Sequence, residues 1–118
     1  MGKDKLSFQL GITIHKNKHF FGPGAAKIME LVKQTGSLSK AYNIMGLSSS
    51  KGWRMIKKAE ENLGFPLIIS TVGGEGGGGS KLSEKGEEFL KNYTKFNQEA
   101  NKEVRVIFNK YFEEYNIY

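Results

Sequence analysis

The chain has 118 residues, 38% of them hydrophobic and 25% charged, with 15 Gly and no Cys. This composition indicates a single globular domain, and it excludes disulfide stapling and cysteine-based zinc sites. No apolar run approaches the roughly 18 residues of a membrane span, and the N-terminus lacks the apolar core of a signal peptide, so we expect a cytoplasmic protein.

Positive charge is concentrated in the first two thirds of the chain. The net charge is +6; residues 1–83 hold 12 Lys and Arg against 5 Asp and Glu, whereas 84–118 hold 6 against 7. A one-sided basic domain indicates a polyanionic partner, most often nucleic acid, although such a surface also serves solubility alone.

The first half of the chain predicts one strand and three helices. Strict alternation of apolar residues over 6–14 predicts a β-strand, and the polar run after it a turn or loop. Residues 23–36 begin with Pro, end with Gly and carry an apolar face at helical spacing, which predicts a helix. A short helix over 37–46 and a basic helix over 47–64 follow, each with a serine to cap its first turn and a glycine to end it.

The second half predicts a β-hairpin and one long helix. Two short runs over 67–72 and 80–83 flank a run of glycines, which would form the tip of the hairpin. From Glu84 to Tyr115, apolar and aromatic residues recur at steps of four and three, as in a coiled-coil-like stripe of about four heptads.

The order of these elements predicts a winged helix-turn-helix. A supporting helix, a short helix behind a tight turn and a basic helix form the helix-turn-helix, and the hairpin is the wing. The expected fold class is mainly α with a small β-hairpin: a winged helix-turn-helix DNA-binding domain over residues 1–83, then a long C-terminal helix over 84–118 for dimerisation. The glycine run contains the GGGGS of common engineered linkers, but without it the hairpin would have no turn, so we interpret it as native.

A known family shares several of these features. The Gly-Ser-hydrophobic-Ser turn at 36–39, Gly46, Ser48 and Trp53, and the run GGEGGGGSKLSEKG at 73–86 resemble the N-terminal domain of the molybdate-responsive (ModE-type) transcription regulators. These regulators are related in fold to the LysR-type winged helices. The resemblance implies DNA binding and dimerisation. It does not imply molybdate sensing, because 118 residues leave no room for the family's C-terminal molybdate-binding domains, and no effector domain is expected.

The sequence departs from the pattern of the family in two ways. Glu75 stands in the wing where the family usually has Lys, which changes the expected contact with phosphate. Ser49 and Ser50 stand where the family has Tyr-Lys, with Lys51 one place later, so the base sequence that is read should differ.

The expected function is sequence-specific binding of double-stranded DNA as a dimeric transcription regulator. The recognition helix over 48–63 would enter the major groove, and the wing over 72–81 would follow the backbone, where glycines allow a close approach. Trp53 is expected in the core, between the two helices. The expected DNA contacts come from the turn, the recognition helix and the wing: Ser37, Ser39, Ser48, Ser49, Ser50, Lys51, Arg54, Lys57, Gly76, Gly77, Gly78 and Lys81.

The long helix is expected to extend beyond the domain and to pair with a second copy. About thirty helical residues span roughly 45 Å, more than the expected width of the rest of the domain. The remaining apolar stripe would then form a homodimer interface from Phe96, Val104, Ile107 and Tyr111. Two copies related by a twofold axis require a pseudo-palindromic DNA site.

Other interpretations of the sequence remain open at this stage. A winged-helix module that docks protein partners would use its charge only for solubility. Gly74, Gly76 and Gly79 have the spacing of a nucleotide-binding loop, but no helix begins inside the glycines and no β-run follows, so we expect no enzyme and no cofactor. His15 and His19 are four residues apart in an expected turn, with no carboxylate nearby, so no metal site is expected. The acidic pairs Glu60–Glu61 and Glu87–Glu88 are expected on solvated helix surfaces.

Overall fold

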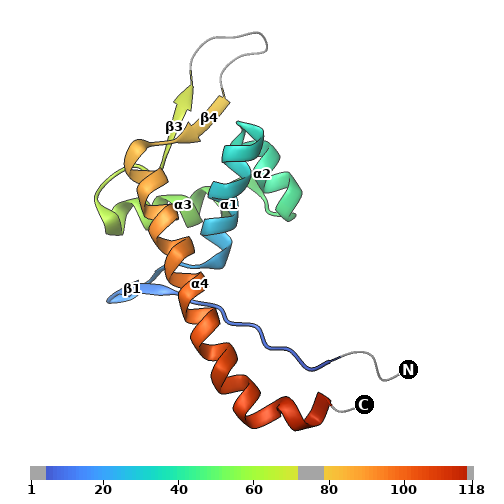
Figure 1. The fold of residues 1–118 in the computed structure, drawn as a ribbon. Coiled ribbons are helices and arrows are strands. Elements are labelled where there is room, and N and C mark those ends of the chain that lie inside the picture. Colours follow the sequence, from blue (N-terminus) through green and yellow to red (C-terminus); the bar gives the residue numbers. More distant parts are fainter. Residues whose placement is uncertain (1–4, 72–78, 117–118) are drawn as a thin grey trace.

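The computed structural model describes residues 5–71 and 79–116. In chain order its elements are β1 (Ile14–Lys16), β2 (Lys18–Phe21), α1 (Pro23–Thr35), α2 (Leu38–Met45), α3 (Ser49–Leu63), β3 (Ile68–Thr71), β4 (Gly79–Leu82), α4 (Glu84–Phe112) and a 3-10 turn (Glu113–Asn116). Helices α1 to α3 pack together, the β3–β4 hairpin projects at one end, and α4 runs past them toward the opposite end (Figure 1).

The structure confirms the expected fold class, mainly helical with a small hairpin and a long C-terminal helix. Strands β3 and β4 pair antiparallel, with Ile68 opposite Leu82 and Thr71 opposite Gly79. The hairpin is joined to the helices, because the backbone N–H of Ser80 donates a 2.8 Å hydrogen bond to the carbonyl oxygen of Gly36. This bond connects the wing to the turn between α1 and α2.

The predicted strand over residues 6–14 is wrong for most of its length. Residues 5–13 have no regular secondary structure, and the strand that forms, β1, begins only at the end of the alternating run and pairs with β2. The expected turn after residue 14 therefore contains a short hairpin, with Asn17 at φ 72° between its two strands. Asparagine adopts this left-handed conformation more readily than most residues do.

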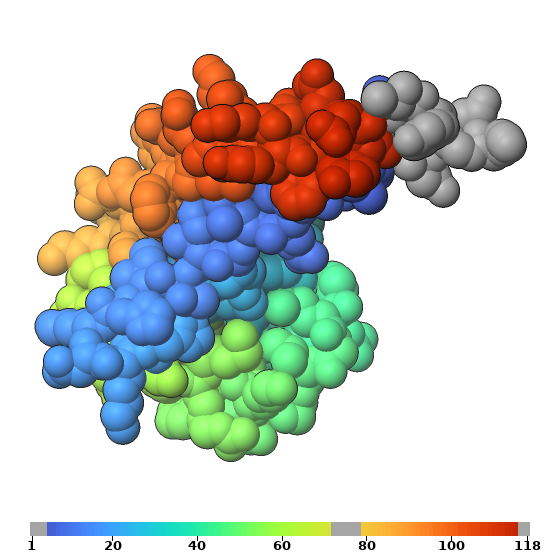
Figure 2. Space-filling view, turned by 90° about the horizontal axis from the view of Figure 1, so that it is seen from below, coloured from blue at the N-terminus to red at the C-terminus, as the bar shows by residue number. Residues whose placement is uncertain are grey.

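The alternating residues pack on a helix instead of on a sheet. The hydroxyl of Tyr93 on α4 donates a 2.7 Å hydrogen bond to the carbonyl oxygen of Ile12, and the rings of Phe8 and Phe108 lie 5.1 Å apart. The N-terminal segment therefore runs alongside α4. Figure 2 shows the two in contact. An extended chain with one apolar face has the same sequence period whether a strand or a helix covers that face.

The core lies between α1 and its neighbours. Its largest fully buried side chains are Phe21, Ile28, Met29, Val32 and Leu67. Phe21 comes from β2, and its ring meets two rings of α4 edge-on, with centroid distances of 4.8 Å and 4.9 Å. Such edge-on aromatic pairs stabilise a core beyond the burial of their surface, so they fix α4 against the domain.

The prediction that Trp53 belongs to the core is wrong, because its side chain is 55% exposed. The buried face of α3 is centred on Gly52, Ile56 and Ala59. A Cβ atom at Gly52 would lie 2.3 Å from a ring carbon of Tyr42, so the backbone of α3 packs directly on α2 there. Each residue turns a helix by roughly 100°, and the position after Gly52 therefore faces away from the core.

Candidate nucleic-acid interface

The helix-turn-helix is held in place by caps at the starts of α2 and α3. The Ser37 hydroxyl accepts a 3.1 Å hydrogen bond from the backbone N–H of Lys40, and the Ser48 hydroxyl accepts one of 3.1 Å from that of Lys51. Gly46 ends α2 in the left-handed conformation, at φ 71°. Ser37 and Ser48, both predicted to contact DNA, therefore have a structural role as N-caps.

The outward face of α3 is basic. Lys51, Arg54, Lys57 and Lys58 are all exposed, as are the predicted contact residues Ser49 and Ser50. The ion pairs among the described residues are Lys57–Glu60 at 3.4 Å and Lys33–Glu87 at 3.7 Å. Within the described residues, three of the four cations on α3 thus have no acidic partner, and their charge is available to an anion.

Glu60 connects the recognition helix to the wing. Its Oε2 atom accepts hydrogen bonds of 2.8 Å from the backbone N–H of Leu67 and 3.3 Å from that of Ile68. Its side chain is only 11% exposed, which corrects our expectation that Glu60 belongs to a solvated helix surface. The position of β3 relative to α3 therefore depends on one carboxylate.

The predicted wing contacts are described only at the base of the hairpin. Lys81 is exposed on β4, while Gly76, Gly77 and Gly78 lie outside the described residues. At the base, the Thr71 hydroxyl accepts a 2.8 Å hydrogen bond from the backbone N–H of Gly79. The same glycine approaches the turn after α1 so closely that an added Cβ would lie 2.6 Å from the carbonyl oxygen of Gly36.

The turn before α2 brings two of the predicted serines together. The hydroxyl oxygens of Ser37 and Ser39 lie 3.1 Å apart, and Ser39 is exposed. Thr35 supports this turn: its hydroxyl donates a 2.7 Å hydrogen bond to the carbonyl oxygen of Leu31 and lies 3.2 Å from the backbone N–H of Ser37. The wing is thus joined by hydrogen bonds both to the turn before α2, through Ser80 and Gly36, and to α3, through Glu60.

The second half of α4 carries the residues predicted for a dimer interface. Phe96, Ile107 and Tyr111 are exposed, and Val104 is half-buried. These residues belong to an apolar surface that nothing in the described part of the chain covers completely. The N-terminal segment covers part of this half of α4, because Phe8 packs on the ring of Phe108.

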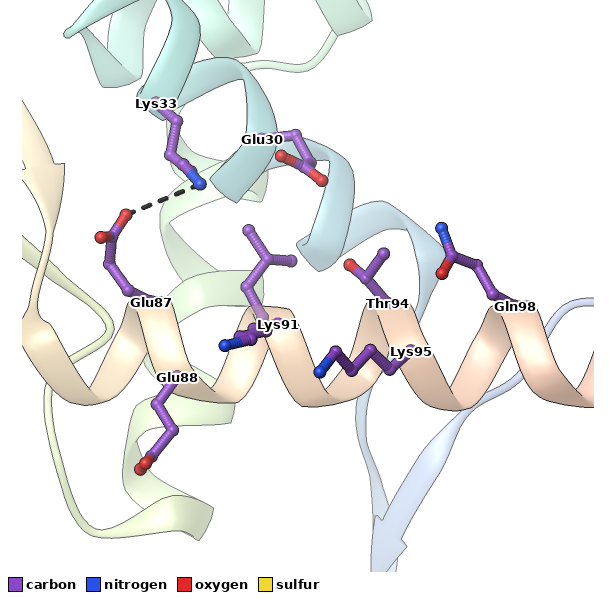
Figure 3. A pocket seen from close by; sticks show the side chains of 9 residues that line it. Glu30, Lys33, Glu87, Glu88, Lys91, Thr94, Lys95 and Gln98 are labelled. Atoms are coloured by element: carbon purple, nitrogen blue, oxygen red, sulfur yellow. Dashed lines mark ion pairs between the residues drawn. The ribbon is translucent and has the colours of Figure 1, made fainter.

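A groove of about 590 Å³ lies between α1 and α4, but its charges are mixed. It is lined by acidic residues such as Glu30 and Glu88 and by lysines such as Lys91 and Lys95, and the Lys33–Glu87 ion pair crosses it (Figure 3). Because both signs of charge alternate along this groove, it does not favour a polyanion. The basic face of α3 does.

Two tyrosines show perturbed acidity for structural reasons. Burial raises the pKa of Tyr42 above its ordinary value of 10.0, and the negative charge of Glu60 adds to the effect. Burial also raises the pKa of Tyr93, which a hydrogen bond with Asn97 partly offsets. Both side chains are buried in the core.

A metal site and a membrane-spanning helix each require a characteristic pattern of residues. Within 5–71 and 79–116, no three His, Cys, Asp or Glu residues cluster as metal ligands would. His15 and His19 face each other across the β1–β2 hairpin, with ring centroids 5.6 Å apart, and the Thr13 hydroxyl lies 2.8 Å from His15 Nε2. None of the described helices is long and apolar enough to cross a membrane.

The fold and this surface define a winged helix-turn-helix protein with a basic recognition helix. The chain is similar to a molybdenum transport protein, ModE, of Herbaspirillum seropedicae (29% identity over 72% of this chain and 30% of that protein). It is also similar to the molybdenum-pterin-binding protein MopB of Rhodobacter capsulatus (26% over 70% and 31%) and to the transcriptional regulator ModE of Yersinia pestis (28% over 75% and 34%). The chain is therefore a relative of the ModE-type regulators, and it spans about a third of the length of these curated proteins.

Residues 29–117 also match a family described as the carbamoyl-phosphate synthase L chain, ATP binding domain. This match conflicts with the fold. A nucleotide site is a concave, mostly apolar pocket, whereas the described part of this range forms helices and one two-stranded hairpin around a mixed-charge groove. Of the glycines with the spacing of a phosphate loop, Gly79 lies in β4, and α4 begins only at Glu84. The winged helix-turn-helix fold agrees instead with the similarity to the ModE-type regulators.

Two residues of the candidate interface were missed by sequence reasoning. Trp53 is exposed on α3 although its apolar character predicted burial, and Glu60 binds β3 although its charge predicted a solvated surface. The helical position of Trp53, one residue after a glycine on the buried face, is the signal that would have placed it outside.

Proposed function

We propose that this chain binds double-stranded DNA in a sequence-specific manner as part of a transcription regulator. The observation that supports this most directly is the outward face of α3, where Lys51, Arg54 and Lys58 have no acidic partner among the described residues. In a helix-turn-helix the second helix lies in the major groove with its N-terminal residues toward the base edges. The chain acts in this proposal as a binding protein and not as an enzyme.

The contacts divide by residue type and position. Arg54 lies on the outward face of α3 and suits a bidentate contact with guanine, and the exposed serines before it suit either bases or phosphates. Lys81 on β4 suits the phosphate backbone beside the recognition helix, and the glycine tip of the wing would follow the same backbone. The printed name of the Yersinia pestis relative, transcriptional regulator ModE, supports the regulatory role.

Selection of bound duplexes from a random pool tests the proposal. We expect an enriched motif. Arg54→Ala should weaken binding to this motif by about 1–3 kcal/mol, because a base contact is lost. The affinity for random duplex should fall less. Lys81→Ala should weaken both alike. Failure of the wild-type chain to enrich any motif or to bind duplex DNA at low salt would favour a module that docks protein partners.

We also propose that α4 joins two copies into a homodimer, so that the chain divides into a DNA-binding part over residues 1–83 and a dimerisation part over 84–118. The exposed stripe of Phe96, Ile107 and Tyr111 supports this, and the near balance of charge in the tail lets two copies approach. Two recognition helices would then read a pseudo-palindromic site with half-sites roughly 34–36 Å apart or a multiple of this.

Ile107→Asp tests the dimer, with Asn109→Asp as a control that adds the same charge at another exposed position on α4. We expect Ile107→Asp to give a folded monomer by sedimentation, with most of the site-specific affinity lost and weak, salt-sensitive duplex binding retained. A variant that stays dimeric, or a monomer that binds the full site undiminished, would show that α4 is not the interface on which tight binding depends.

A further inference from the structure

Trp53 is the one large apolar side chain exposed on α3. The other exposed residues of this helix, which is described over its full length, are Ser49, Ser50, Lys51, Arg54, Lys57, Lys58 and Glu61. More than half of the surface of Trp53 is accessible. Tryptophan is among the residues that contribute most when they are buried in an interface. An exposed indole amid cations is therefore unlike an ordinary solvated helix face.

Trp53 lies in the first half of α3 and toward the wing. Steps of four and three along the helix lead from Trp53 to Lys57 and then to Glu60, which binds the start of β3. The Nζ atom of Lys57 lies 5.8 Å from the centroid of the indole ring. Since this cation suits a phosphate, a duplex that contacts Lys57 comes close enough to contact Trp53 as well.

The chemistry of the surrounding residues limits what Trp53 contacts. Serine, lysine and arginine form hydrogen bonds with base edges and phosphates, whereas the carbon surface of an indole gains from apolar contact. In the major groove, the apolar feature of the base edges is the C5-methyl group of thymine. Within an intact duplex the base faces are already stacked, so a side chain at the groove surface meets their edges.

We propose that Trp53 contacts the C5-methyl group of one thymine in each half-site and thereby selects that base. The inference rests on the proposed DNA binding and adds a specificity-determining residue to it. One buried methyl group corresponds to about a fourfold change in affinity. Loss of the whole indole should weaken binding to the selected site by about ten- to thirtyfold, in the range of interface tryptophans.

Two measurements test this inference. Trp53 is the single Trp of the chain, so its emission should change when the selected duplex is added to the 118-residue chain. Affinities are then measured for duplexes in which each thymine is replaced in turn by deoxyuridine, which lacks the methyl group. We expect one position per half-site where the replacement weakens wild-type binding about fourfold but leaves Trp53→Ala unaffected.

Two further variants serve as controls. Trp53→Phe keeps an apolar ring and should retain most of the affinity and the sensitivity to the methyl group. Val106→Ala shortens another exposed apolar residue, on α4, and should behave as wild type toward every deoxyuridine duplex. Because Trp53 is exposed, we expect circular dichroism to show folded protein for each variant. Should Trp53→Ala not fold, the change in emission of the wild type on binding still tests the inference.

Several results would overturn the inference. Unchanged emission during tight binding, full affinity of Trp53→Ala, or equal deoxyuridine effects in wild type and Trp53→Ala would exclude a contact with the methyl group. Equal loss on random and selected duplexes would assign Trp53 to the sugar-phosphate backbone instead. If the wild type binds duplex DNA and replacing Trp53 does not change this binding, only the present inference is contradicted. If the wild type binds no duplex DNA, the proposed function is contradicted as well.

Discussion

Replacing Glu60 by Ala removes the side chain that joins the recognition helix to the wing. The carboxylate accepts hydrogen bonds from two backbone N–H groups, at 2.8 Å from Leu67 and 3.3 Å from Ile68. Leu67 is fully buried, so its N–H cannot turn to water when the acceptor is lost. A buried donor without a partner costs about 1–3 kcal/mol, and the longer bond to Ile68 adds less.

We therefore expect Glu60→Ala to lower the free energy of unfolding by about 2–3 kcal/mol in urea titrations followed by circular dichroism. For a domain of this size the midpoint of thermal unfolding should fall by roughly 8–15 °C. Glu60→Gln keeps one neutral acceptor and should lose about half as much. The exposed neighbour Glu61→Ala is the matched control, with a change of about 0.5 kcal/mol or less. Equal stabilities of the Glu60 and Glu61 variants would refute the reasoning.

Three further predictions follow from other contacts. Gly86→Ala places a Cβ 2.3 Å from the carbonyl oxygen of Leu67 and should destabilise the fold by about 1–3 kcal/mol. Gly24→Ala places a Cβ against only the flexible end of a methionine and should leave the stability nearly unchanged. Denaturant unfolding of both variants checks this contrast. Because burial raises the pKa of Tyr42 and Tyr93, the unfolded chain loses these protons first, so the free energy of unfolding should fall as the pH rises above about 10. Tyr42→Phe should reduce that alkaline loss in unfolding curves between pH 9 and 11, and an unchanged slope would count against the burial of this hydroxyl. Tyr93→Phe loses the hydrogen bond to the N-terminal segment and should speed hydrogen exchange there while α1 stays protected.

The helices could be predicted because their ends are encoded locally. Proline at the start of α1, serines before α2 and α3, and glycines after all three are where the structure has them. Caps and stops depend on residues within one turn of the chain, so a single sequence is enough to recognise them. The wing was predictable for a similar reason, since two short β-rich runs flank one turn.

The contacts that sequence reasoning missed depend on partners far along the chain. The alternation over residues 6–14 predicted a covered apolar face, but nothing in it says that α4 provides the cover. Glu60 binds backbone atoms of β3 seven and eight residues away, which no helical pattern encodes. Trp53 was misplaced because Gly52 lets α2 approach the backbone of α3, which moves the centre of the buried face.

The central claim is that the basic face of α3 meets the phosphates and bases of duplex DNA, and the dependence of affinity on salt tests it most directly. A plot of log affinity against log salt should be steep and linear, with a slope of about 0.9 per neutralised phosphate. Replacing Lys51 and Lys58 together by Ala should lower this slope by about 1.8, because each of these exposed lysines neutralises one phosphate in this account. Replacing Lys91 and Lys95 of the α1–α4 groove removes the same charge and should leave the slope unchanged. A flat dependence for wild type, or equal slopes for both double variants, would contradict the account.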